Sequence, residues 1–302
     1  MSALRGPGAN GLAFAGLLLN ALVWGVSWFP FRQLEAAGLH PLWSTGFIYA
    51  LAIPVVLMWR PAAWRPFLQQ PWLWLLMLAA GLTNAGFNWA VTIGDVVRVV
   101  LLFYLMPVWS VLLAWWLLGE RPQRVALLRL LLALTGVVIV LKTPESPWPL
   151  PQSLPDWLAL LGGLCFALTN VLLLKLKNEP DEARMLAMFG GGSFLTMGLA
   201  SAGVGLGAVA MPPDLQWSWL AIVLLVGLAF LISNIGLQYG AARLSASTTA
   251  LTMLTEVVFA SFSSVLLGAS NLHPRTLLGG ALILLATVWA AWPTRVSSPP
   301  VQ

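Results

Sequence analysis

The sequence predicts an all-α integral membrane protein with ten transmembrane helices, arranged as two inverted five-helix repeats around a central cavity. Two observations carry this prediction, the composition and a segment that occurs twice. Hydrophobic residues make up 59% of the 302 residues and charged residues only 8%, and the mean hydropathy is +0.87. A helix that crosses a bilayer needs about 20 apolar residues, so ten would use roughly two thirds of the chain. Only short loops remain, and no separate soluble domain is expected.

The segment that occurs twice lies at residues 96–141 and 245–292. In the first copy Gly119 follows Pro107 by twelve residues, and in the second Gly268 follows Glu256 by twelve. A further apolar helix follows in each copy. Many secondary transporters are built from a doubled set of membrane helices with the substrate site between the halves. The repeat therefore indicates function as well as fold.

The individual helices are the apolar stretches that lie between proline-marked breaks, because proline ends helices. The first stretch follows Arg5, and its small-residue triplet 13–15 precedes the apolar run, where the cleavage site of a signal peptide would follow it. We expect a retained helix there. The predicted helices lie at residues 11–30, 42–59, 72–92, 96–118, 124–141, 156–174, 184–208, 216–240, 245–268 and 275–292.

The same breaks divide the chain into two repeats. We expect a first repeat at residues 1–142, a proline-rich linker loop at 143–155, a second repeat at 156–295 and a short C-terminal tail at 296–302. Because five helices per repeat is an odd number, the second repeat must be inserted upside down relative to the first.

Basic residues predict the orientation, since cytoplasmic loops carry an excess of Lys and Arg. With the N-terminus inside, ten lie in inner loops and tails and four in outer ones. Both termini are therefore expected in the cytoplasm, and the location expected is a bacterial-type inner membrane. The ten inner residues are Arg5, Arg60, Arg65, Arg121, Arg124, Lys175, Lys177, Arg184, Arg243 and Arg295, and the four outer ones are Arg32, Arg98, Lys142 and Arg275.

Composition also argues against several classes. The net charge of +5 comes from scattered basic residues rather than a stripe, so no nucleic-acid partner is expected. Cys165 is the only cysteine and lies in an apolar run, which favours an inert packing residue. The histidines, His40 and His273, lie in predicted outer loops, which argues against a metal site within the membrane. No phosphate-binding loop, Gly-x-Ser-x-Gly element or acid–base pair at membrane depth is present, so neither an enzyme nor a cofactor is expected.

Polar pairs at membrane depth are candidates for a binding site. Asn84 and Asn88 are four residues apart and share a helix face, and so do Asn234 and Gln238. An offset of 150 places one pair on the other, so each half offers two amides at corresponding positions. These amides could hydrogen-bond the ammonium and carboxylate of an amino acid. The alternative is that they only join helices to each other.

Glu256 is the strongest single candidate for a functional residue, because it lies near the middle of the ninth predicted helix. A charge at that depth costs about 2.5–3.5 kcal/mol, and such residues usually face a cavity. We expect it to contact a substrate ammonium or to bind and release a proton during transport. The alternative is a structural, hydrogen-bonded glutamate.

Aromatic and proline residues complete the candidate set. Tyr104 lies one turn before Pro107, which removes a backbone hydrogen bond and is a candidate hinge for alternating access. Tyr239 adjoins Gln238 and is expected near the inner mouth. The remaining candidates for the cavity are Trp24, Trp109 and Asn170. The glycines at 190–192 predict either close helix packing or bending.

The two halves resemble the EamA-type repeat of the drug/metabolite transporter superfamily. The resemblance rests on residues 24–27 (Trp-Gly-Val-Ser), on residues 104–107 (Tyr-Leu-Met-Pro) and on residues 119–121 (Gly-Glu-Arg). The resemblance covers almost the whole chain. The chain length and the general character of the sequence suggest the aromatic amino-acid exporter branch of the superfamily. The second half departs from the pattern, with Glu256 in place of Pro107 and Ala269 in place of Glu120. Equivalent roles are therefore not expected at those positions.

The resemblance implies a secondary transporter without ATP hydrolysis. Combined with the candidate residues, it predicts export of aromatic and other neutral amino acids and related small metabolites across the inner membrane by alternating access. The alternative is a broad exporter of drugs and cationic compounds. The expected partners are a small-molecule substrate and the lipid bilayer, and the expected state is a monomer.

Overall fold

Helices form all the regular structure that a computed structural model describes at residues 7–93, 96–141, 151–267 and 274–291. Their order along the chain is α1 (Pro7–Ala36), α2 (Pro41–Trp59), a 3-10 turn η1 (Pro61–Ala63), α3 (Trp64–Gln69), α4 (Pro71–Ile93), α5 (Val96–Phe103), α6 (Met106–Leu118), α7 (Arg124–Leu141), α8 (Leu154–Lys175), α9 (Asp181–Gly205), α10 (Trp217–Ala241), α11 (Ala246–Met253), α12 (Thr255–Leu266) and α13 (Pro274–Ala291). The all-α prediction is confirmed for these residues.

Length and apolar composition make five of the described helices able to cross a membrane: Gly11–Ala36 within α1, and α2, α8, α9 and α10. The shorter apolar helices among these residues are Met106–Leu118 and Leu277–Ala290. The predicted number of ten spans remains a prediction.

The continuous helices predicted over 96–118 and 245–268 are wrong. α5 ends at Phe103 and α6 begins at Met106, so Tyr104 and Leu105 separate them. Pro107 lies in the first turn of α6, where its missing N–H breaks no intrahelical bond. The second copy is interrupted at Leu254, between α11 and α12. The offset of 149 that places Glu256 on Pro107 also places Leu254 on Leu105, so both copies of the segment break at the same point.

Other differences concern helix ends. α1 reaches Ala36 and keeps Pro30 inside it, which membrane helices tolerate because neighbouring helices satisfy the freed backbone groups. η1 and α3, between α2 and α4, were not predicted. The short connection predicted at 93–95 falls partly on residues 94–95, outside the described residues.

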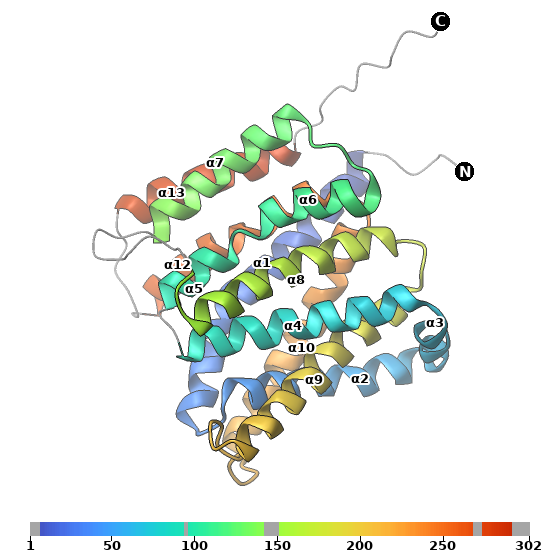
Figure 1. The fold of residues 1–302 in the computed structure, drawn as a ribbon, viewed down its shortest axis with the longest axis vertical. Coiled ribbons are helices and arrows are strands. Elements are labelled where there is room, and N and C mark those ends of the chain that lie inside the picture. The colour runs from blue at the N-terminus through green and yellow to red at the C-terminus, as the bar shows by residue number, and fades with distance from the viewer. Residues whose placement is uncertain (1–6, 94–95, 142–150, 268–273, 292–302) are drawn as a thin grey trace, which may run out of the picture.

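Helices from the two halves pack against each other throughout (Figure 1). α7 and α13 lie side by side at the top of the view, α1 and α8 cross the middle, and α2, α4, α9 and α10 lie towards the bottom. α3 lies at the right-hand edge, beside the end of α4.

Two of these helix crossings are equivalent under the repeat. α1 meets α10 where a Cβ added to Gly16 would lie 2.6 Å from the Gly236 carbonyl oxygen. α4 meets α8 where a Cβ added to Gly86 would lie 2.9 Å from the Leu158 carbonyl oxygen. Gly236 and Gly86 differ by 150, and Leu158 and Gly16 differ by 142. Glycine permits such close backbone approach, and the repeated crossing shows that the halves pack on each other in a symmetric way.

Most of the buried apolar residues belong to two large clusters. One contains Phe103, Leu237 and Met253, and the other contains Tyr49 and Phe230. Residues of both clusters reach the cavity described next, which therefore lies between them.

Candidate functional site

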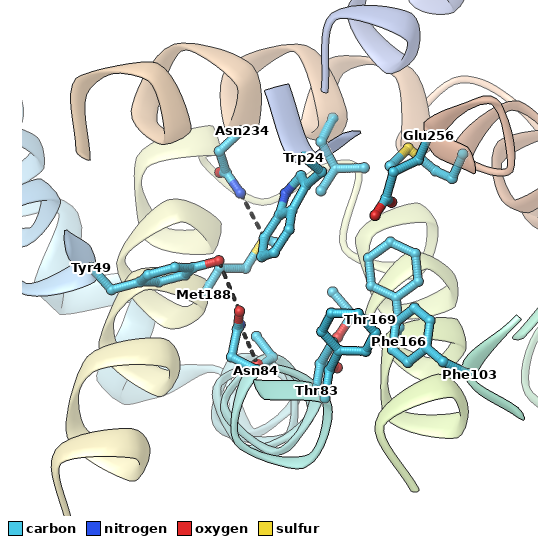
Figure 2. Close-up of a pocket in the computed structure, with 14 residues that line it drawn as sticks. Trp24, Tyr49, Thr83, Asn84, Phe103, Phe166, Thr169, Met188, Asn234 and Glu256 are labelled. Carbon is cyan, nitrogen blue, oxygen red and sulfur yellow. Dashed lines mark hydrogen bonds between the residues drawn. The ribbon is translucent and has the colours of Figure 1, made fainter. Parts of the chain in front are cut away.

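A cavity lies where the two halves meet, and Figure 2 shows it. It contains about 620 Å³ of space not filled by atoms, part of it open to the outside. Its lining comes from α1, α2, α4, α5, α8, α9, α10, α11 and α12. The lining residues are Trp24, Tyr49, Ala80, Thr83, Asn84, Phe87, Phe103, Phe166, Thr169, Met188, Asn234, Leu237, Met253 and Glu256.

The lining is drawn from corresponding positions of the two halves. The offset of 142 that aligns α1 with α8 pairs one tryptophan with a phenylalanine, and the offset of 150 that aligns α4 with α10 pairs two asparagines. The pairs that line the cavity are Trp24 with Phe166, Asn84 with Asn234, and Phe87 with Leu237. These six lining residues occupy corresponding positions of the two halves.

Tyr49 and Asn84 form one polar wall. The Tyr49 hydroxyl donates to Asn84 Oδ1 at 3.1 Å, and Asn84 Nδ2 donates to the Ala80 carbonyl oxygen at 2.8 Å. Because a carbonyl only accepts hydrogen bonds, these two contacts fix which way the Asn84 amide points. Of the chain's three tyrosines, Tyr49 was the one not predicted from the sequence as a cavity residue. Its only available signal was a phenolic hydroxyl about one turn after Ser44 and Thr45 in a mostly apolar helix.

Asn234 lines the cavity on the side of α10, and Gln238 lies behind it. The two side-chain amides are 2.7 Å apart, and the Asn234 amide nitrogen lies 3.6 Å from Met188 Sδ. Gln238 is buried and comes within 3.2 Å of backbone groups of Asp181 and Met185 on α9. It therefore links α10 to α9 and holds Asn234, and it is not part of the lining.

Asn88 also points away from the cavity. Its amide nitrogen donates to Thr45 Oγ1 on α2, and Thr45 donates in turn to the Pro41 carbonyl oxygen at 2.8 Å. Of the two amide pairs predicted from the sequence, one member of each, Asn84 and Asn234, reaches the cavity. The other member of each joins helices.

Glu256 directs its carboxylate into the cavity from the first turn of α12 (Figure 2). The Tyr104 hydroxyl donates a hydrogen bond to it, so the two helix breaks face each other. The first turn of a helix favours negative charge, because free backbone N–H groups point towards it. Gly25 lets α1 approach this turn, since an added Cβ would lie 2.8 Å from the Glu256 carbonyl oxygen.

Aromatic rings form the apolar wall beside Glu256. The ring centroids of Phe87 and Phe103 are 4.7 Å apart, and those of Phe103 and Phe166 are 5.9 Å apart. In Figure 2 the Phe103 and Phe166 rings lie next to the Glu256 carboxylate. Across the cavity, Trp24 stacks on Phe230 with a centroid distance of 4.6 Å.

The remaining predicted residues do not line this cavity. Pro107 is buried in the first turn of α6. Trp109 is half-buried, and its indole N–H has no hydrogen-bond partner. Asn170 is buried, and neither of its amide atoms has a hydrogen-bond partner, although the adjacent Thr169 lines the cavity. Tyr239 lies under the Arg243 guanidinium, 3.7 Å from its ring centroid.

The chemistry of the lining is that of a binding site. Its residues include one carboxylate, two amides and two threonine hydroxyls, and they include no Lys, Arg or His. Within the described residues, no three His, Cys, Asp or Glu side chains are grouped so that they could hold a metal ion.

These features are those of a helical membrane protein with a cavity lined by both of its halves. The sequence model of the EamA-like transporter family matches residues 11–142 and 153–292. The chain belongs to that family, which is part of the drug/metabolite transporter superfamily. The family resemblance found in the sequence is thereby confirmed.

Similarity to individual proteins agrees with the family. The chain is 29% identical over 162 residues to the uncharacterized transporter PA0485 of Pseudomonas aeruginosa, and the match covers 50% of each protein. It thus spans about half the length of that curated relative. A solved crystal structure matches with a TM-score of 0.71 at 19% identity, covering 92% of this chain and 96% of the other. That likeness concerns the fold alone.

Proposed function

We propose that this protein is a secondary transporter that exports aromatic and other neutral amino acids, and related small metabolites, across the inner membrane by alternating access. The observation that supports this proposal is the division of the cavity. A carboxylate lies beside aromatic rings on one wall, and neutral hydrogen-bonding groups lie on the other.

Each part of an amino acid has a partner of matching chemistry in the lining. The ammonium group would bind Glu256, because hydrogen bonds between charged groups are the stronger ones. The carboxylate would accept hydrogen bonds from the amides of Asn84 and Asn234. An apolar or aromatic side chain would lie against Phe87, Phe103 and Phe166.

The proposed architecture has ten spans in two inverted repeats, at residues 1–142 and 156–295, joined by the linker at 143–155 and followed by the tail at 296–302. The α5–α6 segment makes one broken span, and the α11–α12 segment makes its counterpart. Discontinuous helices around a midplane site are typical of transporters with inverted repeats. Both termini would lie in the cytoplasm, and the protein would act as a monomer.

Alternating access would rock one repeat against the other about the helix breaks. Pro107 follows the first break and is the proposed hinge. Asn170 and Trp109, whose polar atoms lack partners here, and Tyr239 would contact the substrate on its way between the cavity and the cytoplasm. Asn88 and Gln238 would keep the amides of the lining in place.

A second candidate is export of organic cations. The one carboxylate of the lining is that of Glu256, and no basic side chain accompanies it. Aromatic rings beside a carboxylate also attract cations through their electron-rich faces. A ligand with an amine and no carboxylate would satisfy both features.

Ligand stabilisation of the purified protein separates the two candidates, because a bound ligand raises the unfolding temperature. An aromatic amino acid, the amine that lacks its carboxylate and the acid that lacks its ammonium would be compared. The amino-acid proposal expects stabilisation by the first only. Equal stabilisation by the amine would favour the cation exporter, and stabilisation by the acid alone would contradict both.

A further inference from the structure

We propose that Tyr49 determines the size of the substrate that the cavity accepts, and that Gly192 is the position that allows the Tyr49 ring to lie back from the cavity. This inference rests on the proposed function only in taking the cavity as the substrate site. Tyr49 was not among the candidates found from the sequence, and Gly192 was noted there only as one of the glycines at 190–192, for helix packing or bending.

The Tyr49 ring is held on several sides. Its centroid lies 5.3 Å from that of Phe189 on α9 and 5.9 Å from that of Phe230 on α10. Its hydroxyl is held by Asn84 on α4 at 3.1 Å. The ring therefore contacts side chains of α4, α9 and α10, and it also lines the cavity (Figure 2).

Gly192 lies directly against the ring. A Cβ added there would lie 2.2 Å from Tyr49 Cδ1 and 2.6 Å from Cε1, which is far inside van der Waals contact. Even an alanine must therefore displace the ring. The push comes from α9, and Phe230 on α10 and the hydrogen bond to Asn84 limit sideways movement. We therefore expect the displaced ring to move towards the cavity.

The three consecutive glycines of α9 have different neighbours, and this provides a matched control. An added Cβ at Gly191 would lie 1.9 Å from the Met77 carbonyl oxygen, which fixes the crossing of α9 with α4. At Gly190 the nearest atom to an added Cβ is 3.8 Å away, in ordinary contact. Gly190→Ala thus makes the same chemical change two residues away without pushing on Tyr49.

Four variants test the proposal by counterflow into vesicles loaded with tryptophan or threonine: Gly192→Ala, Gly190→Ala, Tyr49→Ala and the double variant Gly192→Ala/Tyr49→Ala. We expect Gly192→Ala to lower the ratio of tryptophan to threonine transport by about tenfold or more, as tight pockets discriminate by that factor per methylene group. Gly190→Ala should keep the wild-type ratio. The double variant should behave like Tyr49→Ala, because the clash disappears with the ring.

The contrary results are equally specific. Equal loss of both substrates in Gly192→Ala, the same change in Gly190→Ala, or a double variant that still shows the Gly192→Ala ratio would each overturn the size-filter role. Such a pattern would show that Gly192 serves helix packing instead.

Thiol labelling measures the same property without any transport. In a Cys165→Ala background, Thr83→Cys places a single thiol in the lining. We expect Gly192→Ala to slow its reaction with a bulky maleimide much more than with a small methanethiosulfonate. Equal slowing would overturn the inference. If wild type transports no amino acid and yet this size-dependent slowing is seen, the proposed function fails and the role of Tyr49 stands.

Discussion

Replacing Glu256 with glutamine is the most informative single change, because it removes the one carboxylate of the cavity lining and keeps the side-chain size. The proposed ammonium contact is a hydrogen bond between charged groups, which is worth about 1.5–3 kcal/mol. At 1.4 kcal/mol for each factor of ten, the half-saturation concentration for an amino acid should rise about 10- to 150-fold. The Tyr104 hydroxyl can still donate to the glutamine oxygen, so the helix breaks should keep their contact.

Counterflow into proteoliposomes measures this change. Glu120→Gln is the matched control, because Glu120 is an exposed carboxylate outside the cavity. Tyr104→Phe should weaken amino-acid affinity less, by about 1 kcal/mol, since it removes one neutral donor to the carboxylate. Unchanged half-saturation in Glu256→Gln, in protein that still binds substrate, would refute the assigned ammonium contact.

The same variant tests whether Glu256 couples transport to protons. If it binds and releases a proton in each cycle, Glu256→Gln should abolish flux driven by a pH gradient and spare amino-acid exchange. Gradient-driven flux with unchanged pH dependence would show that the coupling group lies elsewhere.

Three further predictions concern other parts of the molecule. Asn84→Ala removes one substrate contact and the acceptor of the Tyr49 hydroxyl, so it should weaken the binding free energy for an amino acid by about 1–3 kcal/mol. Titration of the purified variant measures this, and wild-type affinity would exclude Asn84 from the site. Gly136→Ala should lower the thermal unfolding midpoint in detergent, because the new Cβ would lie 2.6 Å from the Gly279 carbonyl oxygen and overpacking costs about 1–3 kcal/mol; an unchanged midpoint would contradict this packing of α7 on α13. Burial lowers the pKa of His40, and its Nδ1 accepts a hydrogen bond from the Leu42 N–H at 3.2 Å, so the folded protein favours the neutral imidazole. The thermal unfolding midpoint should therefore fall as the pH drops below about 6.5 in wild type but not in His40→Asn.

The repeat made part of the site predictable. The offset of 150 singled out Asn84 and Asn234, and both line the cavity. The same offset also selected Asn88 and Gln238, which share a helix face with them. Four residues advance a helix by about 6 Å and by 40° beyond a full turn, so the second amide of each pair meets a neighbouring helix instead. The partners that decide this, such as Thr45 for Asn88, are not visible in a single sequence.

The breaks in the fourth and ninth predicted helices show a second limit. Pro107 signalled a kink, but the chain leaves the helix before it, at Tyr104 and Leu105. In the second copy no proline or glycine marks the break at Leu254. The contact of Glu256 with Tyr104 across the two breaks is a tertiary interaction, and local sequence carries no signal for it. Tyr49 was missed for the same reason, because its position against Gly192 depends on how α2 packs on α9.

The most direct test of the account is counterflow with wild-type protein. Vesicles loaded with excess unlabelled phenylalanine, tryptophan, methionine or threonine would be diluted into the same labelled amino acid. Carrier-mediated exchange predicts a transient overshoot of label above vesicles without protein, largest for the aromatic amino acids. No overshoot with any of the four, from protein shown to be folded, would contradict amino-acid transport and leave the cavity to a different class of substrate.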